Sequence, residues 1–148
     1  MDVEIGDDTF EVKEGLLYNK SNLWFNEEDG TVGLSDYAQA QLGDISFVDL
    51  SLLEEGLEVS QATYDGNEPS SDPIPDASIE SSKTVAEIYA PVSGTIADVN
   101  SEDLEMEPEL LNQDPYGTWL IKIDASDLDG EKGNLMDAEA YAEHIKSL

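Results

Sequence analysis

The chain has 148 residues and a formal net charge of −29, because 35 Asp and Glu stand against only six Lys and no Arg. Such an anionic surface repels phosphate groups, which excludes nucleic acid and anionic membranes as partners. There is no Cys, which excludes disulfides, thiolate metal sites and cysteine nucleophiles.

The apolar content is sufficient for a folded core despite the charge. Leu, Ile, Val and Phe number 16, 9, 8 and 3, or 36 of the 148 residues. This fraction exceeds the roughly 20% below which highly charged chains are disordered. We expect one monomeric domain over residues 1–148. Since the sequence shows no leader and no run near the roughly 18 apolar residues of a membrane span, we also expect it to be cytoplasmic.

The acids are spread along the whole chain instead of forming a tail. Self-repulsion at this charge destabilises a compact state unless salt screens it. We interpret the composition as an adaptation to a salty cytoplasm. The alternative is an acidic protein from an ordinary cell.

The first half of the chain predicts short strands and one helix. Short apolar runs between turn residues predict strands at residues 9–12, 16–18, 23–25 and 31–34. Residues 35–43 begin with a capping Ser35, continue with helix formers and end at Gly43, which predicts a short helix. Strand composition returns at residues 45–50 and 57–59.

Residues 65–78 interrupt this pattern. They include three of the six prolines and, up to Asp76, Ile74 as the one apolar side chain. Little apolar area and many turn residues are typical of an exposed loop. We expect residues 65–78 to form an inserted, flexible loop.

A hairpin is expected around Lys83. The strand pattern resumes at residues 79–89, on both sides of this lysine, and a turn at residues 91–94 leads into another strand at residues 95–100. The pattern places Lys83 between two strands.

The rest of the chain predicts one strand and two helical segments. Residues 108–112 fit a single helical turn with Pro near its start, and residues 119–123 fit a strand. Apolar residues at helical spacing after residue 135 predict a C-terminal helix capped by Asn134 or Asp137. The fold class is therefore mainly β with short helices and a C-terminal helix.

Catalytic and metal sites find little support in the sequence. With 35 carboxylates, the spacing between acids carries no information. The single histidine is His144. A Ser-His-Asp triad would need a serine in a nucleophile-elbow sequence, and a zinc site would need further nitrogen or sulfur ligands, and the sequence shows neither. We expect His144 to be an ordinary surface or helix-end residue. Residues 124–133 do not match a calcium loop, because Ala125 takes its first ligand position. We expect no catalytic residues and no metal.

Lys83 is the residue that stands out. It lies between Ser82 and Thr84, with Glu80 three residues before it and Gly94 eleven residues after it. Spacing alone favours an ordinary solvated lysine in a hairpin.

The sequence around Lys83 resembles the glycine cleavage system H protein family, the lipoyl carriers of glycine oxidation. The matching stretches follow the order and nearly the spacing of the family: residues 33–50, 80–83, 88–94, 107–117, 119–120 and 135–141. The resemblance covers about residues 16–145. Within the family, the chain is similar to a halophilic archaeal version.

This resemblance implies a flattened barrel-sandwich hybrid of the lipoyl/biotinyl-carrier type. It implies lipoate in amide linkage on Lys83, with Glu80 and Gly94 contributing to recognition of the attachment site. A flexible four-carbon stem on a rigid hairpin suits such an arm. The implied partners are glycine decarboxylase (P-protein), aminomethyltransferase (T-protein), dihydrolipoyl dehydrogenase (L-protein) and a lipoate-attaching enzyme. The chain itself is then a carrier and not an enzyme.

Three departures from the family pattern leave alternatives open. The usual His-Glu-Trp is Asn22-Leu23-Trp24, the usual Val before the lysine is Ser82, and residues 65–78 are inserted. An H-like lipoate-binding protein of another pathway, such as sulfur oxidation, and a degenerate carrier with an unmodified lysine are the alternatives. A biotin carrier is disfavoured, because its Met-Lys-Met is Ser82-Lys83-Thr84 here.

Overall fold

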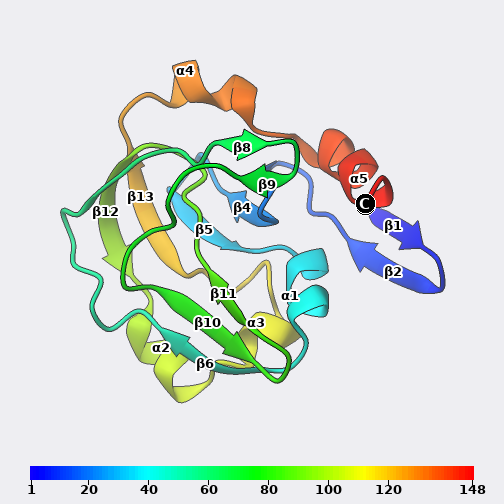
Figure 1. Ribbon diagram of the computed structural model, residues 1–148, viewed down its shortest axis with the longest axis horizontal. Helices are drawn as coiled ribbons and strands as arrows, with labels where there is room; N and C mark the ends of the chain where they lie inside the picture. The colour runs from blue at the N-terminus through cyan, green and yellow to red at the C-terminus, as the bar shows by residue number, and fades with distance from the viewer.

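Short strands dominate the computed structural model, which describes residues 1–148 (Figure 1). The strands are β1 (Asp2–Ile5), β2 (Asp8–Glu11), β3 (Leu17–Tyr18), β4 (Leu23–Phe25), β5 (Thr31–Leu34), β6 (Ile45–Asp49), β7 (Glu58–Val59), β8 (Tyr64–Asp65), β9 (Glu68–Pro69), β10 (Ser78–Ser81), β11 (Val85–Glu87), β12 (Gly94–Val99) and β13 (Ile121–Ala125). The helices are α1 (Asp36–Leu42), α2 (Ser101–Met106), α3 (Leu110–Gln113), α4 (Leu128–Glu131) and α5 (Ala138–Lys146), with a 3₁₀ turn at Lys132–Asn134.

Two sheets form the body of the molecule. One has six strands in the order β3-β4-β5-β13-β12-β7, and the other has three in the order β11-β10-β6. The pairs β1-β2 and β8-β9 form separate two-stranded sheets. All strand pairs are antiparallel.

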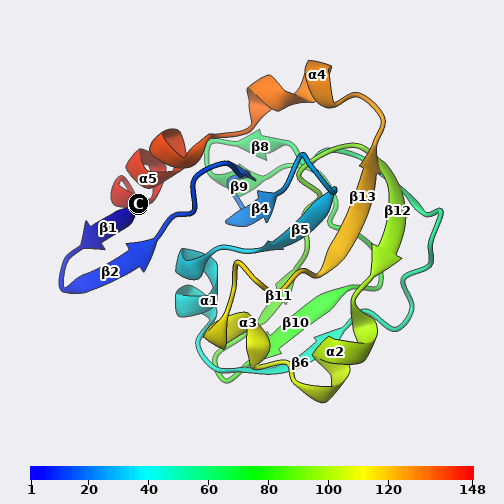
Figure 2. The ribbon, with the colours of Figure 1, turned by 180° about the vertical axis from the view of Figure 1, so that it is seen from behind.

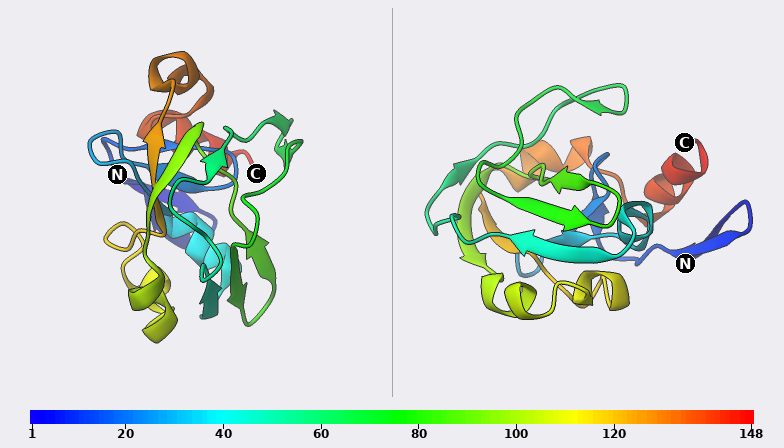
Figure 3. Two further views of the ribbon diagram at one scale, coloured as in Figure 1. Left: turned by 90° about the vertical axis from the view of Figure 1, so that its left-hand side faces the viewer. Right: turned by 60° about the horizontal axis from the view of Figure 1, so that its bottom comes forward.

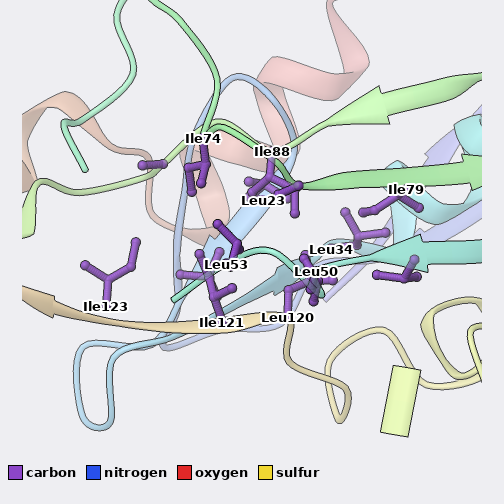
Figure 4. Packing of buried hydrophobic residues seen from close by; sticks show 14 of the residues in the cluster. Leu23, Leu34, Leu50, Leu53, Ile74, Ile79, Ile88, Leu120, Ile121 and Ile123 are labelled. Carbon is purple, nitrogen blue, oxygen red and sulfur yellow. The ribbon is translucent and has the colours of Figure 1, made fainter. Parts of the chain in front are cut away.

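The two larger sheets share one hydrophobic core of 22 buried residues. Side chains from both sheets gather there, including Ile79 of β10, Leu34 of β5 and Ile121 of β13 (Figure 4). Because neighbouring residues of a strand face opposite sides, burial of Ile79 fixes β10 on the core and leaves Glu80 on the outside. The core therefore gives the hairpin around Lys83 a rigid base.

A second cluster of nine buried residues packs one face of α5 against residues of the first 24 positions. The rings of Tyr18 and Tyr141 stack with centroids 4.3 Å apart, and the Tyr141 hydroxyl lies 2.7 Å from Ser35 Oγ. Burial raises the pKa of both phenols, so both remain protonated. Asp137 caps α5 by accepting a hydrogen bond from the Ala140 N–H. This cluster holds α5 beside β1, so that the N-terminal hairpin and the C-terminal helix lie on the same side of the molecule (Figures 2 and 3).

Most of the expected elements are confirmed. Helix α1 begins after Ser35, whose side chain accepts a hydrogen bond from the Ala38 N–H, and ends at Gly43, which has a φ of 79°. The expected strands of the first half, the hairpin around Lys83 and the C-terminal helix are present. The late strand runs over Ile121–Ala125, two residues beyond the expected range. Strand β1 and helices α2 and α4 were not expected from the pattern.

The exposed loop expected at residues 65–78 is exposed only in part. β8 and β9 pair as a small hairpin, and Ile74 is buried in the main core. The Ile74 N–H also donates to the Ile88 carbonyl oxygen at 2.8 Å, and Ala77 is buried. Burial of Ile74, which lies between two prolines, therefore holds this segment against the main core.

The charged residues lie outside both clusters. The buried polar residues are Asn19, Thr31, Ser35 and Thr118, and no Asp or Glu is among them. No helix is long and apolar enough to cross a bilayer.

Candidate functional site

The tip of the β10–β11 hairpin presents Lys83. The last strand pair is Glu80 with Val85, so the next four residues, 81–84, form the turn (Figure 1, lower edge). The Ser81 N–H donates to the Thr84 carbonyl oxygen at 2.9 Å. Ser81 Oγ accepts hydrogen bonds from the Lys83 and Thr84 N–H groups, each at 3.2 Å. One serine thus closes the turn from within and fixes the backbone from which the lysine projects.

A second contact ties the tip to the end of α1. The Ser82 N–H donates to the Asp44 carbonyl oxygen at 3.0 Å. The stem of Lys83 lies beside Gly43, since a Cβ at Gly43 would be 3.3 Å from Lys83 Cε. The absence of a side chain there leaves room for the stem.

Asn112 of α3 holds the α1–β6 connection in place. Its side-chain amide donates to Gln39 Oε1 and to the Gly43 carbonyl oxygen, both at 2.9 Å. Its oxygen accepts a hydrogen bond from the Ile45 N–H at 2.9 Å. Asn112 lies in residues 107–117, one of the stretches that resemble the family. The sequence alone does not indicate its hydrogen bonds, because its partners are about 70 residues away.

Lys83 is exposed, and its ammonium group makes no ion pair. The two ion pairs of the molecule are Lys132–Glu27 at 2.9 Å and Lys146–Glu143 at 3.4 Å. Lys13 and Lys20 are also exposed and without an ion pair, so what sets Lys83 apart is its place at a hairpin tip. Glu80 shares the hairpin with Lys83 and is also exposed and without an ion pair.

The structure does not bring Gly94 to this tip. Gly94 begins β12 in the six-stranded sheet, where it pairs with Val59 and Ala125. A Cβ at this position would overlap the carbonyl oxygen of Asp124. The close approach of the two strands therefore accounts for a glycine here by packing alone.

His144 is more enclosed than a surface histidine. Its Nε2 is buried without a hydrogen-bond partner, and its ring centroid lies 6.4 Å from that of Tyr141. Burial lowers the pKa of His144, and the Lys20 ammonium lowers it further. No group of three His, Cys, Asp or Glu side chains is arranged to hold a metal ion.

The comparisons with known proteins point to one family. The profile of the family described as Glycine cleavage H-protein matches residues 16–148. A Thermococcus kodakarensis chain described as a probable glycine cleavage system H protein is 47% identical over 149 residues, which cover 99% of each chain. The glycine cleavage system H protein of Salinibacter ruber is 42% identical over 133 residues, covering 88% of this chain and 95% of that one.

A solved structure shows the same fold. The crystal structure of a glycine cleavage system H protein from Mycobacterium marinum superposes with a TM-score of 0.71 at 28% identity, covering 90% of this chain and 98% of that one. This match confirms the expected barrel-sandwich hybrid. The chain therefore belongs to the glycine cleavage H-protein family, the non-catalytic lipoyl carriers of the glycine cleavage system.

Proposed function

We propose that Lys83 is the residue that carries the lipoyl group. The observation that supports this most directly is the exposed, unpaired ammonium group at a hairpin tip braced by Ser81 and by the Asp44 backbone. A rigid root with a flexible stem lets an attached arm sweep a defined volume and raises its concentration at each partner site.

Attachment requires an activated acyl donor, supplied by the lipoate-attaching enzyme. In transfer from a lipoyl adenylate, the Lys83 nitrogen forms an amide bond with the acyl carbon. The acyl–phosphate bond breaks, AMP leaves with its electron pair, and two protons leave the former ammonium group. Gly43 has no side chain to meet the Cδ and Cε atoms of Lys83, which leaves space for the stem that carries the reacting nitrogen.

When attached, the lipoyl group supplies a dithiolane that accepts the aminomethyl group at glycine decarboxylase, presents it to aminomethyltransferase and is reoxidised by dihydrolipoyl dehydrogenase. The contribution of this chain is to position and expose the arm. The matched relatives are named as glycine cleavage proteins, which favours this partner set over that of another lipoate-dependent pathway. A monomeric state and a cytoplasmic location remain predictions.

We also infer that the chain is adapted to high salt. The net charge is −29, no acid is buried, and two ion pairs are the only ones formed. Mobile cations are then the main source of charge screening.

Peptide mapping of protein isolated with its lipoate tests the attachment site. We expect the lipoyl mass on the peptide that contains Lys83, with a formal charge of −30 in place of −29 because one cation is lost. Lys83→Arg should abolish the modification, and Lys122→Arg, as the control, should retain it. Lipoate on another lysine, or modification of the Lys83→Arg chain, would show that the assignment is wrong.

A further inference from the structure

An exposed apolar pair flanks Glu80 on the outer face of the three-stranded sheet. Glu80 of β10 is paired with Phe47 of β6 on one side and with Val85 of β11 on the other. Paired residues project from the same face of a sheet, with Cβ atoms about 5 Å apart. Phe47, Glu80 and Val85 therefore form one continuous row, which we call the outer row, across the strands that Figure 3 (right) shows side by side in green and teal.

Burial confirms which way this row faces. The neighbouring cross-strand row is Val48, Ile79 and Ala86, in which Val48 and Ile79 are buried and Ala86 packs against the core. The outer row points the other way. Phe47 is 43% exposed and Val85 is 58% exposed, and they are two of only six large hydrophobic residues exposed in the chain.

The rest of this face is acidic. The next outward-facing pairs join Ser78 to Asp49 and to Glu87. Neither these two acids nor Glu80 forms an ion pair. The face thus combines two apolar side chains with three carboxylates that form no ion pair, although Asp49 accepts hydrogen bonds from the Ser51 N–H and hydroxyl. Such a face complements a partner surface that has an apolar pocket and basic side chains around it.

We propose that the outer row is the docking surface for the lipoate-attaching enzyme, with Phe47 and Val85 as apolar anchors and Glu80 facing a basic side chain of that enzyme. This inference rests on the proposed attachment at Lys83. It adds Phe47, from a strand outside the hairpin, and Val85 as residues that decide how well the chain is recognised before it is modified.

Geometry favours the attaching enzyme over the later partners as the occupant. An acyl carbon must come within about 3–3.5 Å of the lysine nitrogen to react. Before modification, only the four-carbon stem of Lys83 spans the gap, so the enzyme must lie directly against the hairpin. Adjacent strands are only about 4.8 Å apart, so a contact area of ordinary size at the tip includes the outer row. The later partners meet the longer lipoyl arm and can stand farther off.

The test is the initial rate of lipoyl transfer to the full chain by a lipoate–protein ligase with lipoate and ATP, followed by intact mass. We expect Phe47→Ser to lower kcat/KM about tenfold, mainly through a higher KM, as for loss of one anchor side chain. Val85→Thr keeps the branched shape but replaces one methyl group by a hydroxyl, and should lower kcat/KM roughly threefold. Given excess time, each variant should still reach one lipoyl group on Lys83.

Matched controls separate the outer row from general effects. Leu148 is 55% exposed and lies outside the row, so Leu148→Ser should react like the wild-type chain. Glu80→Gln should raise KM, whereas Glu4→Gln, on the exposed side of the β1–β2 hairpin, should not. Thermal unfolding checks that each variant is folded. If Phe47→Ser is not, Val85→Thr and Glu80→Gln decide the question.

The outcomes distinguish this inference from the proposed function. Wild-type kcat/KM for Phe47→Ser, Val85→Thr and Glu80→Gln, with Lys83 fully modified, overturns the docking surface alone. A wild-type chain that takes up no lipoyl group on Lys83 overturns the proposed function and this inference together. An equal loss in Leu148→Ser and Val85→Thr also overturns the docking surface.

Discussion

At the scale of single residues, the presentation of Lys83 depends on side chains that are not themselves modified. Ser81 closes the turn through its hydroxyl, and Asn112 of α3 fixes the connection between α1 and β6 by hydrogen bonds. Gly43 leaves room for the lysine stem. The site is therefore a rigid mount for one mobile side chain.

Replacement of Asn112 tests this mount. Asn112→Ala should lower the free energy of unfolding by about 2 kcal/mol, because the Ile45 N–H and the Gly43 carbonyl oxygen lose a partly buried partner. Asn112→Asp keeps the acceptor for Ile45 but sets a carboxylate oxygen against the Gly43 carbonyl oxygen, so it should be at least as unstable as Asn112→Ala. Urea denaturation gives the values.

Asn67 provides the matched control for Asn112. It is exposed in the β8–β9 hairpin, and its side chain makes no hydrogen bond, so Asn67→Ala should change the free energy of unfolding by less than about 0.5 kcal/mol. Equal stabilities of Asn67→Ala and Asn112→Ala would contradict the role of Asn112.

At the scale of elements, the sequence predicts the elements whose ends depend on neighbouring residues. It misses those that depend on contacts between distant parts of the chain. Ser35 and Gly43 mark the ends of α1 by local capping chemistry, so that helix was predictable. Helix α2 was not predicted, because Asn100 makes no side-chain capping bond and Leu104 is the single buried residue of the helix.

The same distinction holds for the site. Lys83 and Glu80 share one hairpin, so their proximity follows from the strand–turn–strand pattern. Gly94 pairs with Val59 and Ala125, and Asn112 bonds to residues of α1 and β6. Such long-range pairings carry no signal in a single sequence, and their structural roles could not be predicted.

The segment of residues 65–78 should divide into two parts with different stabilities. Ile74→Ala should lower the free energy of unfolding by about 2–4 kcal/mol, because it leaves a cavity in the main core. Deleting residues 65–68, the exposed end of the β8–β9 hairpin, should have little effect, since these residues bury little area and loop-closure entropy changes slowly with length.

Hydrogen exchange followed residue by residue checks this division. The Gly66 and Asn67 amides should exchange fast, while the Ile74 N–H, which is bonded to the Ile88 carbonyl oxygen, should be protected. Equal protection across residues 65–78 would refute the proposed flexibility of the tip. Fast exchange at Ile74 would contradict its place in the core.

At the scale of the whole molecule, charge should make stability depend on salt. The Debye length falls from about 30 Å at 0.01 M to about 3 Å at 1 M, so added salt suppresses repulsion between exposed carboxylates. We expect the midpoint of thermal unfolding to rise steeply with KCl. A gain of about 2 kcal/mol corresponds to roughly 8 °C for a domain of this size.

A variant with fewer acids separates charge screening from the general strengthening of hydrophobic burial by salt. Glu54, Glu55 and Glu58 are exposed near β7, and changing all three to Gln should flatten the dependence on KCl. Midpoints that stay constant from about 0.1 to 3 M KCl, across the screened range, would refute the halophilic interpretation and leave the carrier function untouched.

The central claim is that this chain serves glycine cleavage through one modified lysine, and the most direct measurement is glycine–bicarbonate exchange by glycine decarboxylase with the lipoylated chain as the carrier. The wild-type chain should support exchange, and Lys122→Arg should match it. Lys83→Arg should support none, although its fold and its thermal unfolding should be unchanged because Lys83 makes no ion pair. Exchange at the wild-type rate with Lys83→Arg would contradict the account.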